Sequence, residues 1–249
     1  VAAVHPSLPW LPEGMDLDLM YVRFLQKLWS TSAVEVEVLE NRNPEEWLWP
    51  LKSSGDRQLH LLLPASSILG SAWMDRLVRA SPWPVYAVAM GAAPFWRAML
   101  SEMPAVLKHF ETQDMLMVLD AYDMVFANCK PDSILFEYRK HEKPSLVSAE
   151  KFCFPKDIGS CPSCADSYCR NSDFHYLNSG GIMGTADALS HAFLWMQENT
   201  PDTGDDQAAW HLYHRKFPER VALEHQPRIW VTLQGAVMEQ FVVRSGDRC

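Results

Sequence analysis

The chain has 249 residues, of which 48% are hydrophobic and 21% are charged, a composition typical of a folded globular domain. Its 22 Lys and Arg residues against 31 Asp and Glu residues give a formal net charge of −9. A negative field of this size repels phosphate backbones, which argues against nucleic acid as a partner. No apolar run approaches the ~20 residues that a transmembrane helix needs, so we expect no membrane span in this chain.

The first 57 residues are predicted to be an N-terminal extension of unknown role, made of a helix and a strand. Three prolines in residues 1–15 indicate an irregular arm, and apolar residues at helical spacing predict a helix over 16–29. Strict alternation predicts a half-exposed strand at Val34–Val38. Residues 40–57 are polar and broken by Pro and Gly, which indicates a linker.

Residues 58–249 have the pattern of an α/β domain. Continuous apolar runs predict buried strands, and these, with shorter candidate strands, fall at 59–63, 85–89, 115–119, 145–148, 220–224, 228–233 and 240–244. Helical spacing predicts helices at 70–80, 94–111, 131–140, 186–199 and 205–217. Strands that alternate with helices indicate a Rossmann-type, mostly parallel sheet flanked by helices.

Four of the six cysteines lie close together in a polar segment: Cys153, Cys161, Cys164 and Cys169. Such density favours disulfide bonds, which would place the protein in the secretory pathway or outside the cell. The two-residue gap between Cys161 and Cys164 also suits a zinc site or a redox pair, although no second pair with this spacing accompanies it.

Two carboxylates follow the buried strand at 115–119. Asp120 and Asp123 are three residues apart, at the carboxyl end of a strand, where ligands bind in open α/β sheets. Oxygen ligands of this kind suit Mn²⁺ or Mg²⁺ bridging to a diphosphate. The competing interpretation is a helix start, with Asp120 as its N-cap.

Two further segments carry polar groups suited to a ligand. The consecutive glycines of Asn178–Gly181 allow close approach of the backbone to a ligand, or a simple turn. The run Asp205-Asp206-Gln207 opens a predicted helix. Capping explains one of its carboxylates, which leaves the other, with the amide, available for hydroxyl groups such as those of a sugar.

Taken in order, these segments resemble one family, the glycosyltransferase domain of the procollagen lysyl hydroxylases and its stand-alone relatives. The resemblance covers residues 58–245. The segments that carry it are Asp120-Ala-Tyr-Asp123, Ser148-Ala-Glu150, Phe152-Cys-Phe-Pro155, Tyr176 to Gly184, Asp205-Asp-Gln207, Leu223 to Trp230 and Gln234-Gly-Ala236.

The resemblance implies a GT-A-like fold and a retaining, Mn²⁺-dependent (or Mg²⁺-dependent) transfer of a hexose, glucose or galactose, from a UDP-sugar. The implied acceptor is a hydroxyl group on galactosyl-hydroxylysine or another hydroxylated or glycosylated protein side chain, in the endoplasmic reticulum, the Golgi lumen or the extracellular space. The implied residue roles are metal binding by Asp120 and Asp123; donor binding by Tyr122, Asn178, Ser179, Gly180, Gly181 and Gln207; and catalysis by Asp205 and Asp206.

The chain departs from the family pattern at three places. Phe154 stands where the family has Trp, which makes it the candidate residue on the acceptor side. Cys161, Cys164 and Cys169 are extra. The His that serves the family as third metal ligand would fall beyond Cys249, so we expect the domain to be truncated at its C-terminus, and His225 to be structural. The alternative is therefore a non-catalytic module of a larger polypeptide that binds nucleotide or glycan.

Overall fold

The structure is a computed structural model of the chain. It describes residues 48–52, 59–65, 81–89, 95–120, 124–126, 131–151, 153–154, 172–200 and 205–232. All of them belong to the second of two compact units, Val38–Cys249. The elements predicted at 16–29, 34–38, 70–80 and 240–244 lie outside these residues. The division at residue 57 into an extension and a domain stays a prediction.

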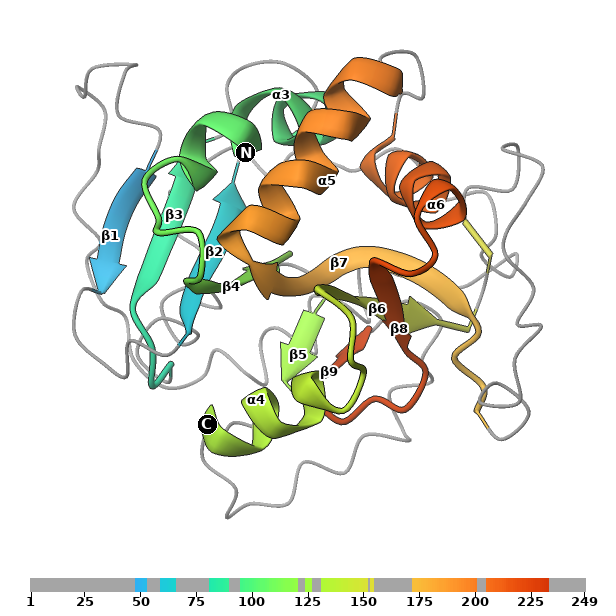
Figure 1. Ribbon diagram of the computed structural model, residues 1–249. Helices are drawn as coiled ribbons and strands as arrows, with labels where there is room; N and C mark the ends of the chain where they lie inside the picture. Colours follow the sequence, from blue (N-terminus) through green and yellow to red (C-terminus); the bar gives the residue numbers. More distant parts are fainter. Residues whose placement is uncertain are drawn as a thin grey trace, which may run out of the picture. The chain divides into compact units, whose positions relative to one another are not determined.

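The described residues form a sheet of seven strands in the order β1-β3-β2-β4-β7-β6-β8 (Figure 1). Their bounds are β1 Leu48–Lys52, β2 His60–Ala65, β3 Val85–Ala89, β4 Met115–Leu119, β6 Ser145–Glu150, β7 Tyr176–Thr185 and β8 Val221–Glu224. Strands β2, β3, β4, β6 and β8 run in one direction, while β1 and β7 run against them. The predicted α/β class with a mostly parallel sheet is confirmed.

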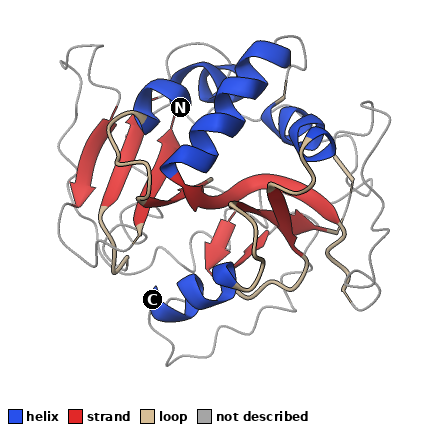
Figure 2. Ribbon diagram, viewed as in Figure 1, coloured by secondary structure: helices blue, strands red, loops and turns tan. Residues whose placement is uncertain are grey.

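Helices cover both faces of this sheet (Figure 2), which explains why its strands read as continuous apolar runs. The helices are α3 Phe95–Leu107, α4 Pro131–Arg139, α5 Ala186–Asn199 and α6 Asp206–Lys216. Alternate residues of β4 point to opposite cores: Leu116 and Val118 pack with α3, α5 and α6, whereas Met117 and Leu119 pack with α4. None of the described helices has the length and apolar character to cross a membrane.

Two parts of the sheet structure differ from the sequence prediction. Residues 40–57 were expected to be a linker, but Leu48–Lys52 forms edge strand β1, paired with β3; Pro50 is tolerated there because an edge strand has a free side. The expected strand at 228–233 is β9, Trp230–Thr232, which pairs with the unpredicted strand β5, Met124–Phe126, in a separate two-stranded sheet.

Strand β7 is the largest departure and also the one that shapes the site. Asn178–Gly181 was expected to be a loop or a turn, yet it lies inside this ten-residue strand between β4 and β6. Ile182 pairs with Val147, and the next pair is Asn178 with Ser148, so three residues of β7 face a single step of β6. We call Ser179–Gly181 the β7 bulge; bulges of this kind redirect side chains next to functional sites.

Replacing Gly184 by Ala should destabilise the protein by about 1–3 kcal/mol, because overpacking in a core forces the backbone to shift. A Cβ atom at this position of β7 would lie 2.8 Å from the carbonyl oxygen of Pro144 and 3.2 Å from Leu189. Urea denaturation measures the change. The control is Leu194→Ala on α5, whose side chain is 43% exposed and should cost much less; equal losses for the two variants would contradict the prediction.

Candidate functional site

The candidate site lies at the edge of the sheet where strands β4 and β6 end. Asp120 directly follows β4, and Glu150 is the last residue of β6. The backbone N–H of Asp120 donates to the carbonyl oxygen of Gly180 at 2.7 Å, which brings the β7 bulge beside it. Helix α6 begins at the same place, because Gln207 in its first turn accepts from the backbone N–H of Ser179 in the bulge at 3.2 Å. Four separate segments therefore converge on this edge.

Gln207 joins three of these segments through its buried amide. Its Nε2 donates to Glu150 Oε1 at 2.6 Å and to the carbonyl oxygen of Phe154 at 2.8 Å. Its Oε1 accepts from Asn178 Nδ2 at 3.3 Å and from the backbone N–H of Ser179 at 3.2 Å. Both N–H donors of the amide are thus bonded, and its oxygen accepts two hydrogen bonds. These contacts fix the first turn of α6 against β6 and β7.

On its β6 side, the β7 bulge is held by polar side chains rather than by ladder bonds. Asn178 Oδ1 accepts from the backbone N–H of Gly180 at 2.9 Å. Ser148 Oγ donates to the carbonyl oxygen of Asn178 at 2.7 Å and accepts from the backbone N–H of Gly181 at 3.2 Å. Because the backbone groups that the bulge leaves unpaired in the ladder find these partners, the irregular strand is stable in a buried position.

The two aspartates of α6 do different things. Asp205 is the N-cap, and its carboxylate accepts from the backbone N–H of Ala208 at 2.9 Å. Asp206 follows in the first turn and accepts a hydrogen bond from the Ser179 side chain. Burial, together with the charges of Asp205 and Asp120, raises the pKa of Asp206 to about 7. Capping therefore accounts for Asp205, whereas Asp206 faces the other acidic groups of the site.

Glu150 is the most deeply buried acid of this region, with no exposed surface. Its Oε2 accepts a second hydrogen bond, from Asn178 Nδ2 at 3.3 Å. Burial, with a smaller contribution from the nearby charge of Asp205, raises the pKa of Glu150 to about 8, although the hydrogen bonds from Gln207 and Asn178 act to lower it. Two amide donors are too few to offset the loss of water around a carboxylate.

Most of the site residues predicted from sequence meet at this edge. Asp120, Asn178, Ser179, Gly180, Gly181, Asp205, Asp206 and Gln207 all belong to the contacts above. Tyr122 and Asp123 lie outside the described residues. Phe154 is half-buried and takes part through its backbone carbonyl, which is bound by Gln207 and by His211 Nε2 at 3.1 Å.

The predictions for metal and cysteine ligands are tested only in small part. Among the described residues, no group of three His, Cys, Asp or Glu side chains is placed to hold a metal ion; the predicted ligand Asp123 is not one of them. Cys153 is disulfide-bonded, while Cys161, Cys164 and Cys169 lie outside the described residues. The wider disulfide framework stays a prediction.

Sequence reasoning assigned no role to Glu150 or His211. Glu150 carries the same signal that singled out Asp120, a carboxylate at the end of a buried strand, and it stood in a segment that was used only for the resemblance. His211 is fully buried within α6, and burial lowers its pKa. A histidine on the inner face of a helix has no local signature, so its contact with Phe154 was not predictable.

Comparison with known proteins gives one family. A match to the family described as PLOD GT domain covers residues 98–248, more than half of the chain. Procollagen-lysine,2-oxoglutarate 5-dioxygenase 2 of Homo sapiens is 28% identical over 144 residues, and its counterpart 1 of Pongo abelii is 30% identical over 145 residues. These matches cover 55% and 54% of the chain, but the chain spans only 18% of either relative.

Solved structures were also found, at lower similarity. A glycosyltransferase involved in the glycosylation of the major capsid of PBCV-1 has a TM-score of 0.47 at 13% identity, covering 73% of this chain and 96% of that one. Mouse xyloside xylosyltransferase 1 has a TM-score of 0.40 at 8% identity, covering 66% and 87%. The family match and the sheet topology together confirm the predicted α/β, GT-A-like class.

Replacing Glu150 by Gln should flatten the pH dependence of stability. The pKa of Glu150 is raised from an ordinary 4.5 to about 8 in the folded protein, so the unfolded chain releases this proton at lower pH. The raised pKa therefore stabilises the folded state at low pH, and that contribution is lost as the pH rises from 4.5 to about 8, at up to roughly 1.4 kcal/mol per pH unit.

The measurement is the free energy of unfolding of both proteins, by urea denaturation at several pH values. The wild-type value should fall relative to that of Glu150→Gln across this window, and circular dichroism checks that the variant keeps its fold. Parallel curves for the two proteins would mean that Glu150 is ionised at its ordinary pKa.

Proposed function

The chain belongs to the PLOD GT domain family, and from this premise we propose that it is a metal-dependent glycosyltransferase that moves a hexose from a UDP-sugar to a hydroxyl group on a protein. The sugar is glucose or galactose, transferred with retention of the anomeric configuration. The acceptor is galactosyl-hydroxylysine or another hydroxylated or glycosylated side chain.

The observation that carries this proposal is the convergence of carboxyl groups with two amides at one sheet edge. The charged groups that shift the pKa of Asp206 are both carboxyls, Asp205 and Asp120. Acidic groups that repel one another in a desolvated edge favour a bound cation, and the amides of Asn178 and Gln207 suit recognition of hydroxyl groups.

The donor chemistry of this edge fits a hard divalent cation, Mn²⁺ or Mg²⁺. In the proposal Asp120 and Asp123 hold it, and when bound it neutralises charge on the leaving diphosphate. The chain's own residues do the rest. The β7 bulge turns its backbone towards the end of β4, and the bond between Gln207 and Asn178 fixes one wall of the proposed donor pocket. We further propose that Tyr122 binds the uridine.

Asp206 is the catalytic candidate of the acidic pair. A fixed carboxylate stabilises the positive charge that grows at the anomeric carbon in the transition state, and it does so best where water is excluded. Ser179 and the helix start hold Asp206 in place. Asp205 caps α6 and so positions Asp206 without the need to touch the sugar.

The proposed location is the lumen of the secretory pathway or the extracellular space. The disulfide bond of Cys153 supports this, because disulfides persist in oxidising compartments. The family whose members include procollagen-lysine dioxygenases supports a protein acceptor.

Mn²⁺ should raise the affinity for UDP, and Asp120→Asn or Asp123→Asn should remove that gain. The expected loss is roughly tenfold or more in Kd, since the cation bridges these carboxylates to the diphosphate. Titration calorimetry with UDP, with and without Mn²⁺, measures it. The control is Asp187→Asn, an exposed aspartate in the first turn of α5. UDP binding that stays metal-dependent in both site variants would refute the metal assignment.

Asp206→Asn should lower kcat for transfer by about 10²–10³ and change the donor KM much less, because the lost interaction acts in the transition state. Asp205→Asn is the matched control: Asn caps a helix as well as Asp, so its turnover should stay near that of the wild type. Steady-state kinetics with UDP-glucose and UDP-galactose and a collagen-like acceptor measure both. Equal losses for the two variants would contradict the division of roles.

A wild-type protein that binds UDP with Mn²⁺ but neither transfers nor hydrolyses any UDP-hexose would support the alternative function, a non-catalytic nucleotide-binding module.

A further inference from the structure

An open surface hollow lies at the same end of the sheet as the candidate site, but it is lined by other residues. Its volume is about 430 Å³. Two short segments line it: Ser172, Asp173 and Phe174 on one wall, and Gln226, Pro227 and Arg228 on the other. We call it the 172/226 pocket. None of its lining residues belongs to the site proposed for the donor.

The two walls are fastened to each other through His225. The Ser172 hydroxyl donates to the carbonyl oxygen of His225, and the His225 ring nitrogen Nδ1 bonds to the carbonyl oxygen of Phe174 at 2.8 Å. Ser172 Oγ also accepts from the backbone N–H of Phe174 at 3.0 Å. These bonds agree with a structural role for His225 and set the shape of the pocket before any ligand binds.

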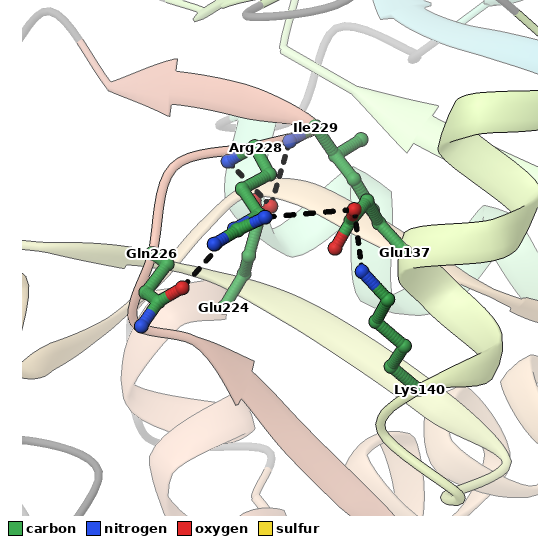
Figure 3. A network of polar contacts seen from close by, with 6 residues as sticks. All are labelled: Glu137, Lys140, Glu224, Gln226, Arg228 and Ile229. Atoms are coloured by element: carbon green, nitrogen blue, oxygen red, sulfur yellow. Dashed lines mark hydrogen bonds and ion pairs between the residues drawn. The ribbon is translucent and has the colours of Figure 1, made fainter.

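A buried acid, Glu224, holds the backbone of the second wall in place, and Figure 3 shows its contacts. Glu224, the last residue of β8, accepts from the backbone N–H groups of Arg228 at 2.8 Å and Ile229 at 2.7 Å. The Arg228 side chain is steadied by Gln226 at 3.0 Å and by Glu137 at 3.8 Å. The Arg228 side chain is nevertheless 57% exposed, so it remains accessible to a ligand beside the pocket.

The first wall carries a negative charge, on Asp173, and it contacts the end of β6 next to the candidate site. Asp173 is 80% exposed and lies 3.4 Å from Lys151 Nζ, which also lies over the Phe174 ring. Lys151 directly follows Glu150, whose carbonyl oxygen accepts from the backbone N–H of His175 at 3.0 Å. The same strand end therefore places the Glu150 carboxyl in the candidate site and its backbone against the wall of the pocket.

We propose that the 172/226 pocket binds the acceptor polypeptide, next to the residue that receives the sugar. This inference rests on the proposed function and adds to it the place where the protein substrate docks. Exposed charges of opposite sign stand on the two walls, Asp173 on one and Arg228 on the other, and the apolar side chains of Phe174 and Pro227 also line the pocket. An extended peptide with acidic and basic side chains flanking proline matches all of these features.

Arg228 then recognises an acidic side chain of the peptide, and a charge-matched pair of peptides tests this. The first probe is a fluorescein-labelled, proline-rich peptide with alternating Glu and Lys; the second has Gln in place of each Glu. Fluorescence anisotropy with wild-type protein should give a Kd roughly threefold to tenfold lower for the Glu peptide, as expected for an exposed but oriented Arg–carboxylate contact.

Arg228→Gln should bind the two peptides equally. The matched control is Lys140→Gln, because Lys140 bonds the same Glu137 oxygen at 2.7 Å but does not line the pocket; this variant should keep the wild-type preference. The backbone N–H of Arg228 stays bound to Glu224 in the variant, so the wall keeps its shape.

Each outcome decides the proposal. Loss of the preference in Arg228→Gln alone supports it, and the transfer reaction should then show a raised KM for the Glu peptide. An unchanged preference in Arg228→Gln overturns it, as does an equal loss in Lys140→Gln. Wild-type protein that shows the preference but transfers no sugar refutes the proposed function while the peptide pocket stands.

Discussion

A buried carboxylate, Glu150, with two amide donors is the interaction on which the rest of the candidate site depends. Gln207 reaches it from α6 and Asn178 from β7, so that a helix start and an irregular strand are fixed to the end of β6. This junction fixes the position of the β7 bulge relative to the acidic first turn of α6. The site is therefore built around a polar core in an otherwise apolar domain.

This arrangement gathers several carboxyl groups in a place that little water reaches. Burial raises the pKa of Glu150, Asp205 and Asp206 alike. Glu224 repeats the pattern at the end of β8, where burial raises its pKa to about 8 although it accepts backbone hydrogen bonds. Asp120 follows β4, and Glu150 and Glu224 end β6 and β8, which leaves this edge suited to cations and to ligands rich in hydroxyl or N–H groups.

Sequence patterns predicted the layers of the fold well, because a strand covered on both faces must be apolar throughout, as Met115–Leu119 is. They failed at Asn178–Gly181, since Asn and Gly disfavour strands, and only the flanking strands β4 and β6 hold this segment extended. The acids at Asp120 and Asp205–Asp206 were predicted because each stands at the end of an element. The junction around Glu150 was not, because its partners lie far along the chain.

This separation along the sequence affects how the site folds. The hydrogen bonds of the junction join residues 28, 29 and 57 positions apart, and β4 meets β7 only after a long excursion of the chain. Closing such loops costs entropy before any contact is gained, and high contact order slows folding. No fragment that ends before α6 can hold these hydrogen bonds, so the site forms only once β6, β7 and α6 have come together.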